Sequence, residues 1–116
     1  RLVMLLNLSN HPSANWAEEQ LAAAGGRGID LPFPQVAPDG DDAYIESLAN
    51  EYLDEILKMD NIDAVHIMGE FNFCFALITK LKAYGIRCVA STTKRETVEE
   101  NGVKISVFRF VKFREY

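Results

Sequence analysis

The sequence predicts an α/β fold, a single Rossmann-like domain of three layers in which helices cover both faces of a mainly parallel sheet. Short apolar runs of strand length alternate with segments whose apolar residues recur at helical spacing, and this alternation indicates βαβ units. Crossovers between parallel strands are right-handed. We expect the flavodoxin-like strand order 2-1-3-4, with the last strand added at an edge. The length suits one core, so we expect one domain over residues 1–116.

The first strand and helix are predicted near the start of the chain. An apolar run at residues 2–8 indicates a buried strand, and residues 9–12 form a polar turn after it. Ser13 is a suitable N-cap for a helix over about residues 14–24, and Gly25 can end that helix.

Residue patterns in the middle of the chain predict two strands and two helices. A very short strand is expected at residues 29–31, and the prolines that follow it favour a place at or near an edge. The clearest helix begins at the acidic residues 39–42 and carries an apolar stripe as far as Leu57. A buried strand at residues 64–68 then leads into a helix that ends at Gly85.

The end of the chain is expected to hold a fourth strand at residues 88–91 and a long polar loop over residues 92–102. Residues 103–114 alternate like a strand, with a change of phase around residues 108–110. A hairpin-like edge or a strand that pairs two copies of the chain would explain this ending.

Charge and cysteine content exclude some functions. The net charge of −5 argues against general DNA binding by bulk attraction. Ten of the 17 acidic residues lie between Asp30 and Asp63, whereas nine of the 12 lysines and arginines lie from Lys80 onward, so a local basic surface stays open. Cys74 and Cys88 lack the spacing of a metal site or a disulfide framework, which indicates buried free thiols in a reducing compartment.

No membrane segment or cofactor motif is expected. The longest apolar runs, residues 2–6 and 71–79, are shorter than the roughly 20 residues that a bilayer span needs. Residues 7–15 turn polar where a secretory signal would continue apolar, so we expect a cytoplasmic protein. The chain has neither GxGxxG nor GxxxxGK[ST], which makes a dinucleotide or ATP cofactor unexpected.

Polar loops follow three strands of the predicted sheet. The loops after the first and third strands flank the point where the strand order reverses, which is where such sheets bind ligands. Helix N-termini in these loops offer free N–H groups that suit phosphate. We therefore expect a phosphorylated small ligand there. The candidate ligand-binding residues are Ser9, Asn10, Ser13, Gly69, Glu70, Phe71, Asn72, Ser91, Thr92 and Thr93.

Two residues are candidates for catalysis. His11 lies in a turn where its ring can reach solvent and serve as a general acid or base. Arg95 can hold a phosphate in a forked contact, although the default interpretation of Lys94-Arg95 is a solvated loop pair. Simpler roles stay open elsewhere: Ser9, Asn10 and Ser13 as turn and cap residues, and Glu70 as a helix cap.

His66 and the aromatic residues around position 73 have structural interpretations. His66 lies between apolar residues in a buried strand and is expected to be a hydrogen-bonded core histidine rather than a metal ligand. Phe71, Phe73 and Phe75 could offer a face on which a base stacks, but core packing is the more ordinary role. Of these three, only Phe71 is expected to be free for a ligand.

Several segments together resemble small CRISPR-associated proteins with a Rossmann-like fold. The closest in plan are the stand-alone relatives of CARF domains, some of which are ring nucleases. The segments that carry the resemblance are Leu6-Asn-Leu-Ser-Asn-His-Pro12, Trp16 with Gln20-Leu21, Met68-Gly-Glu-Phe71, and Ala90-Ser-Thr-Thr-Lys-Arg95.

The resemblance implies a homodimer that binds a cyclic oligoadenylate across its two-fold axis. Ring nucleases cleave without metal by holding a ribose 2′-hydroxyl in line with its own phosphorus, so the protein positions the ligand and stabilises charge. His11 would then assist proton transfer, and Arg95 would offset phosphate charge. The residues implied to contact phosphate, ribose or base are Ser9, Asn10, Ser13, Glu70 and Asn72.

Two other functions remain open. No recognisable nucleophile and base pair is present in the sequence, so the chain could be a non-catalytic module that senses a nucleotide or contacts another protein. An enzyme acting on a small phosphorylated or carboxylated metabolite is also compatible with the fold. Phe108, Phe110 and Phe113 would leave much apolar surface exposed on the last strand of a monomer, and this favours a homodimer.

Overall fold

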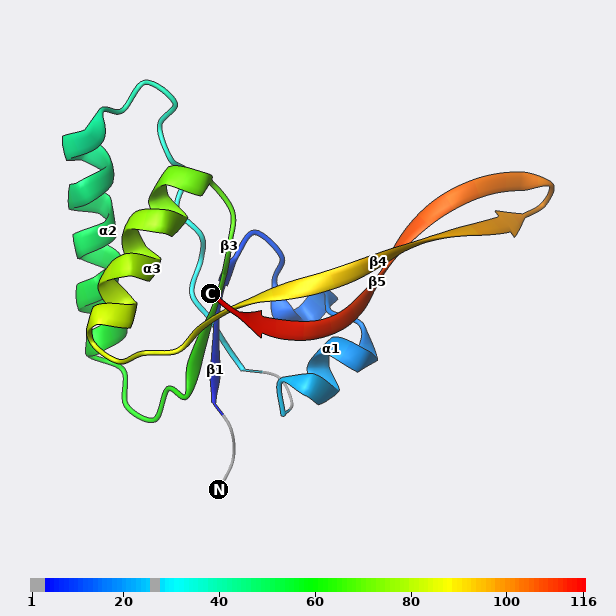
Figure 1. Ribbon diagram of the computed structural model, residues 1–116, viewed down its shortest axis with the longest axis horizontal. Helices are drawn as coiled ribbons and strands as arrows, with labels where there is room; N and C mark the ends of the chain where they lie inside the picture. Colours follow the sequence, from blue (N-terminus) through cyan, green and yellow to red (C-terminus); the bar gives the residue numbers. More distant parts are fainter. Residues whose placement is uncertain (1–3, 26–27) are drawn as a thin grey trace.

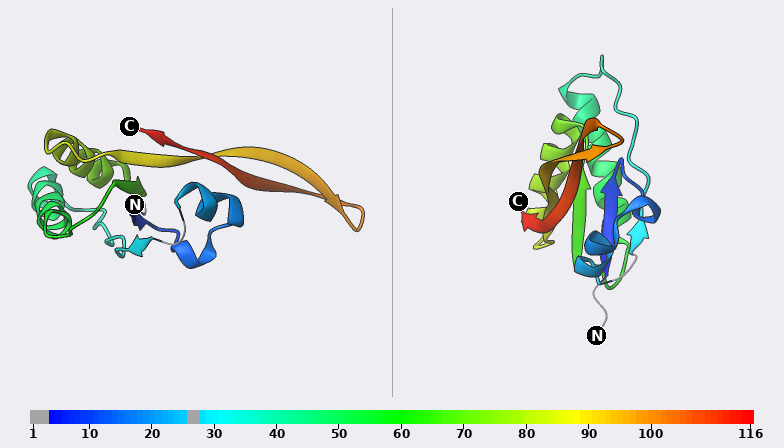
Figure 2. Two further views of the ribbon diagram at one scale, coloured as in Figure 1. Left: turned by 90° about the horizontal axis from the view of Figure 1, so that it is seen from below. Right: turned by 90° about the vertical axis from the view of Figure 1, so that its right-hand side faces the viewer.

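Helices cover both faces of one five-stranded sheet in the computed structural model, which describes residues 4–25 and 28–116 (Figure 1). On one face lie α2 (Asp42–Leu57) and α3 (Phe71–Ala83), and on the other lies the short α1 (Glu18–Ala23). Figure 2 shows these layers with the sheet between them. The predicted three-layer arrangement is confirmed.

The sheet has the order β2-β1-β3-β4-β5. β1 (Leu5–Ser9) lies between two parallel neighbours, β2 (Ile29–Asp30) and β3 (Ala64–Met68). β4 (Cys88–Glu100) runs parallel to β3, and β5 (Val103–Glu115) runs antiparallel to β4 at the far edge. The predicted Rossmann-like order with an added edge strand is therefore confirmed, as is the edge position of the two-residue β2.

The strands divide their side chains between two packed faces. Alternate residues of a strand point to opposite sides of the sheet, so Leu6 of β1 packs with α2 and α3 while Leu5 packs with Trp16 on the α1 side. Asn7 shares the α1 side with Leu5, and its partner in β3 is His66. Asn7 and His66 thus lie side by side under α1, each in a strand whose other residues are mostly apolar.

The region between β1 and β2 differs from the sequence-based expectation. Residues 14–24 do not form one helix, because a 3-10 turn, η1 (Ser13–Asn15), precedes α1, which starts only at Glu18. Ser13 does not cap α1. Its backbone N–H and hydroxyl both donate to the Asp30 carboxylate, at 3.3 and 3.1 Å, and this fixes Ser13 in the turn.

The ends of the other elements follow the predicted signals. Asp41 caps α2 by accepting a hydrogen bond from the Tyr44 N–H at 2.9 Å. α3 ends before Gly85, which adopts a positive φ of 77° that an L-residue with a side chain rarely takes. Residues 2 and 3 of the expected first strand lie outside the described residues, and β1 is described from Leu5.

The expected loop at residues 92–102 is wrong, because these residues continue β4 and turn directly into β5. The turn is made by Asn101 and Gly102, whose φ angles are 51° and 78°. Two consecutive residues with positive φ are typical of the type I′ hairpin turn, for which Asn-Gly is a favoured sequence. β4 and β5 form a long ribbon whose far half projects beyond the rest of the molecule (Figure 1). The whole structure, ribbon included, spans 51 × 42 × 21 Å.

The change of phase in β5 is a β-bulge. Thr92 pairs with Lys112 and Thr93 pairs with Phe110, so Val111 is an extra residue. The predicted phase change lies one residue away from this bulge. Because of the bulge, Phe113 and Phe110 both face the α1 side of the ribbon although they are three residues apart.

No helix in residues 4–25 and 28–116 has the length and apolar character that crossing a bilayer requires.

Candidate functional site

A buried hydrogen-bond network centres on Asn7 of β1, which is 2% exposed. The Asn7 Nδ2 donates to the His11 carbonyl at 2.8 Å and to the Asp30 carboxylate at 3.1 Å. Both partners are pure acceptors, so they fix which end of the Asn7 amide carries the nitrogen. The turn after β1 and the edge strand β2 are therefore tied together through one side chain.

The other end of the Asn7 amide defines the protonation of His66. Asn7 Oδ1 accepts a hydrogen bond from Ser9 Oγ at 2.8 Å and lies 2.9 Å from His66 Nδ1. Because an amide oxygen can only accept, the proton of the neutral His66 ring must sit on Nδ1. The other ring nitrogen, Nε2, is then left with a lone pair.

His66 is held as a neutral, buried ring. Burial, reinforced by the nearby His11, lowers the pKa of His66 from 6.5 to about 4. Two aromatic rings pack against it in T-shaped arrangements, Trp16 with a centroid distance of 5.3 Å and Phe113 with one of 5.4 Å. His66 Nε2 is buried and has no hydrogen-bond partner among residues 4–25 and 28–116, so the expectation of a fully hydrogen-bonded core histidine is only half correct.

A cavity of about 560 Å³ lies between the α1 region and the β4–β5 hairpin, and we call it the α1–hairpin cleft. Trp16 forms part of one wall, and Phe108 and Phe110 of β5 form part of the other. His66 belongs to its base on the sheet. The cleft is therefore mainly aromatic, with polar groups at its edges. Its described lining residues are His11, Asn15, Trp16, Ala17, Gln20, His66, Met68, Ser91, Thr93, Phe108 and Phe110.

Three of the predicted site residues, His11, Ser91 and Thr93, line this cleft. His11 is exposed in the turn after β1, where its ring can reach a ligand or solvent. Ser91 is partly engaged, since its hydroxyl lies 3.0 Å from the Met68 sulfur. The cleft thus brings together residues from the loop after β1 and from β4, as predicted.

Other predicted residues support the cleft without lining it. Ser9 and Ser13 are buried in the network around Asn7 and Asp30. Their structural role is direct, because their hydroxyls hold the turn that carries His11. Asn10 is exposed in that turn.

The loop after β3 does not line the same cavity. Gly69 and Phe71 border a separate cavity on the opposite side of the sheet, and Glu70 and Asn72 border another beside the start of α2. Glu70 caps α3 by accepting a hydrogen bond from the Phe73 N–H at 2.7 Å. A side chain at Gly69 would collide with the Phe33 ring at 2.3 Å, so the need for glycine is explained by packing.

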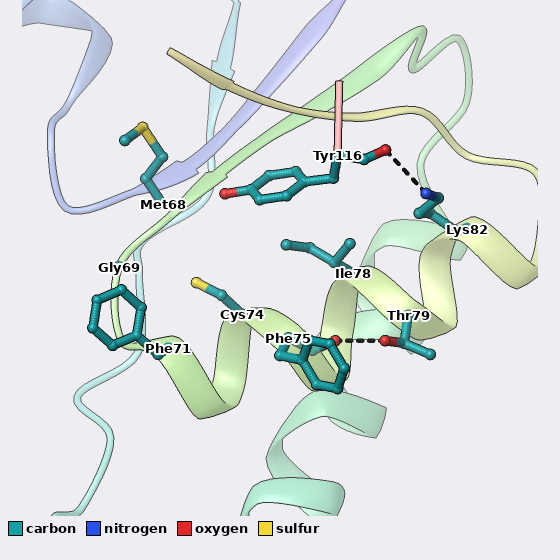
Figure 3. Close-up of a pocket in the computed structure, with 9 residues that line it drawn as sticks. All are labelled: Met68, Gly69, Phe71, Cys74, Phe75, Ile78, Thr79, Lys82 and Tyr116. Atoms are coloured by element: carbon teal, nitrogen blue, oxygen red, sulfur yellow. Dashed lines mark hydrogen bonds between the residues drawn. The ribbon is translucent and has the colours of Figure 1, made fainter. Parts of the chain in front are cut away.

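The cavity beside α3 is apolar and has a volume of about 620 Å³ (Figure 3). Phe71 and Phe75 are 88% and 76% exposed at its rim, so Phe75 is free as well as Phe71, contrary to expectation. The Tyr116 ring lies across the cavity, donating its hydroxyl to the Ile67 carbonyl at 2.6 Å, while Lys82 binds the Tyr116 carbonyl at 2.9 Å.

The remaining two predicted residues lie on the hairpin. Thr92 donates to the Lys112 carbonyl at 3.1 Å. Arg95 donates to the Ser106 hydroxyl at 3.0 Å, beyond the lining of the α1–hairpin cleft. Arg95 pairs with Phe108 across the ribbon, and paired residues share a face. The Arg95 side chain is therefore on the same side of the ribbon as the cleft, beyond Thr93 toward the hairpin turn.

Sequence reasoning missed four residues that make the site: Asn7, Asp30, Phe108 and Phe110. A signal existed for Asn7, because an amide inside an apolar strand must find partners when it is buried. The two phenylalanines were assigned to a dimer surface, since nothing in the sequence shows that the hairpin folds back over α1. Among residues 4–25 and 28–116, no three His, Cys, Asp or Glu side chains gather in a way that could hold a metal ion.

Together, the fold and the cleft define a small Rossmann-like α/β protein with a ligand-sized aromatic cleft beside a projecting β-hairpin. The chain belongs to the family described as Uncharacterized protein MJ1673 family, whose model matches residues 3–114. No curated protein and no solved structure matches the chain.

Proposed function

We propose that this protein binds a phosphorylated ligand of the cyclic oligoadenylate class in the α1–hairpin cleft. The observation that carries the proposal is the cleft itself, in which Trp16, Phe108 and Phe110 line one space of about 560 Å³. Aromatic side chains provide stacking surfaces for nucleobases, whatever their sequence. Polar groups at the edge of the cleft can contact ribose and phosphate.

Charge on the hairpin supports a phosphorylated ligand. The chain is acidic overall, but Lys94 and Arg95 lie just beyond Thr93 on β4, and Arg95 is on the cleft side of the ribbon. An arginine in this place can contact a phosphate with two parallel N–H groups. The hydrogen bond from Arg95 to the Ser106 hydroxyl holds the guanidinium on the cleft side of the ribbon.

Metal-free cleavage of the ligand is the catalytic form of this proposal. It requires a group that can move a proton near the ribose, and His11 is the exposed imidazole at the cleft. His66 does not suit that role, because it is buried and its pKa of about 4 keeps it neutral. Sensing without cleavage is the alternative, and it requires only the stacking walls.

Chromatography of the ligand after incubation separates these alternatives. Purified protein is incubated with cyclic tri-, tetra- or hexa-adenylate in the presence of EDTA, and the products are separated. Linear products from wild type that disappear in His11→Ala support a ring nuclease. A ligand that raises the melting temperature but stays cyclic supports a sensor. The control is Phe75→Ala, which removes an exposed aromatic ring on the opposite face.

We also propose that the protein is a homodimer joined through its hairpins. The ribbon is formed by β4 paired with β5, and its far half projects beyond the body (Figure 1). A two-stranded ribbon is marginally stable by itself. On the face away from α1, its tip carries paired Val98 and Ile105, followed by Glu100 and Val103. The base of the same face carries Lys112 and Arg114 on β5.

This arrangement is self-complementary. In a two-fold pair each residue contact occurs twice, with the roles of the two copies exchanged. If two hairpins packed antiparallel through the face away from α1, the tip of each, with Glu100 and its apolar residues, would lie over Lys112 and Arg114 at the base of the other. The exposed Val103 and Ile105, at 59% and 38%, would be covered.

A further inference from the structure

We propose that His66 Nε2 is a built-in hydrogen-bond acceptor that receives an N–H or O–H group of the ligand in the α1–hairpin cleft. This inference rests on the proposed function, because it concerns a ligand in the same cleft. For an adenylate, the donor is the exocyclic amino group of the base. His66 Nε2 would therefore distinguish adenine, which carries this amino group, from unsubstituted purine, which does not.

The first step is the fixed tautomer. Asn7 cannot turn its amide over without pointing Nδ2 at the ring and Oδ1 at two acceptors, the His11 carbonyl and the Asp30 carboxylate. Asn7 Oδ1 therefore always faces His66 Nδ1, 2.9 Å away. A proton on Nδ1 satisfies this contact, and Nε2 keeps its lone pair.

The second step is the missing partner. Almost every buried polar atom in a folded protein has a hydrogen bond, and an exception calls for a physical reason. His66 is 1% exposed, and its Nε2 has no partner within residues 4–25 and 28–116. Turning the ring over would place carbon against Asn7 and would lose the bond on Nδ1. The protein thus keeps an unpaired acceptor in a rigid position.

The third step is the location of the ring. His66 contributes to the base of the α1–hairpin cleft, between the wall that holds Trp16 and the wall that holds Phe110. A base stacked between those walls would bring its edge toward the sheet. The acceptor is well suited to such an edge, because a neutral ring does not repel the partial positive charge of an amino group.

The ligand test uses adenosine 5′-monophosphate and purine riboside 5′-monophosphate, which differ only in the amino group. ¹⁵N-labelled wild-type protein is followed by long-range ¹H–¹⁵N spectra of its imidazoles and by its backbone amides. We expect His66 to be protonated on Nδ1 before ligand is added, and its Nε2 resonance to move upfield with the adenosine compound. The adenosine compound is expected to bind about tenfold more tightly than the purine compound.

Each other outcome overturns the inference. A proton on Nε2 in the free protein contradicts the tautomer. Amide shifts at Ser91 and Thr93 without any change at His66 Nε2 retain ligand binding but exclude the acceptor. Equal affinity for the two nucleotides excludes it in the same way. If no cleft residue responds to either nucleotide, the inference fails, whereas the proposed function is decided separately by the cyclic oligoadenylates.

The variant His66→Phe provides an independent check, since it keeps a ring between Trp16 and Phe113 but removes the acceptor. Its circular dichroism spectrum shows whether it folds. A folded variant is expected to lose the tenfold preference while still binding the purine compound. A preference that survives in the folded variant would overturn the inference. If the variant does not fold, the wild-type spectra decide.

Discussion

Asn7 and His66 are direct partners in neighbouring strands, and the Asn7 Oδ1 lies 2.9 Å from the His66 Nδ1. This one contact joins the fold to the site. Asn7 also secures the turn that carries His11 and the edge strand that carries Asp30. The same amide therefore sets the position of the exposed histidine and the tautomer of the buried one.

Replacement of Asn7 by alanine is expected to lower the free energy of unfolding by about 2–4 kcal/mol, because buried polar partners lose their hydrogen bonds and a small cavity forms. Urea denaturation measures the loss. The matched control is Asn10→Ala, since Asn10 is exposed three residues later. We expect the control to change stability by less than about 0.5 kcal/mol. Equal effects of the two substitutions would show that the Asn7 network does not stabilise the fold.

Stability is expected to fall as the pH is lowered from 7 to 5. The pKa of His66 is about 4 in the folded protein, mainly because of burial, and returns to about 6.5 on unfolding. Between these values the unfolded chain binds a proton that the folded chain does not, so acid favours unfolding. The expected loss from pH 7 to pH 5 is about 2 kcal/mol.

Urea denaturation at the two pH values measures this loss. The variant His11→Ala is the control, and it is expected to keep most of the pH dependence because burial is the larger cause of the shift. A loss that vanishes in His11→Ala and persists in His66→Phe would contradict the assignment.

Both cysteines are expected to be unreactive in the folded protein. Burial, and secondly Glu70, raises the pKa of Cys74 to about 12, and burial raises that of Cys88 to about 11 despite the opposing effect of Lys82. The reactive species is the thiolate, which is scarce at pH 8. A disulfide reagent should therefore label both thiols only after urea is added. Rapid labelling of the native protein would contradict the expected protection of the two thiols by burial.

If the protein forms the proposed dimer, the double substitution Val98→Ser with Ile105→Ser is expected to convert it into a monomer. These residues form one cross-strand pair on the ribbon face away from α1. Light scattering at micromolar concentration measures the mass. The control is Thr97→Ser with Ser106→Ala, which alters the adjacent pair on the opposite face and should leave the mass unchanged. A wild-type protein that is already monomeric would refute the proposed interface.

The order of the strands was predictable because the buried parallel strands are short apolar runs. β1 and β3 have no solvent face, so their sequences show the pattern clearly. The far half of β4 was not predicted, because both faces of a projecting ribbon are exposed and residues 92–100 have no apolar alternation. The signal that could have found the hairpin was Asn101-Gly102, together with the β-branched Thr92, Thr93 and Thr97.

The site was predicted in part for a related reason. His11, Ser91 and Thr93 were found because polar residues at the ends of parallel strands gather at one edge of the sheet. Gly69 was also proposed on that ground, but its loop turns toward the opposite face and packs on Phe33. The role of Phe110 depends on how the hairpin folds over α1, a long-range contact that local patterns do not encode.

Trp16 makes the proposed binding site directly measurable, because it is the chain's single tryptophan and it lines the α1–hairpin cleft. We would titrate the protein with cyclic tri-, tetra- and hexa-adenylate while recording tryptophan fluorescence. Stacking of a base on or beside the indole is expected to change the emission in a saturable way with at least one ring size, and Phe110→Ala should weaken that response while Phe75→Ala does not. Emission that stays unchanged with all three ligands would contradict binding of this ligand class in the cleft.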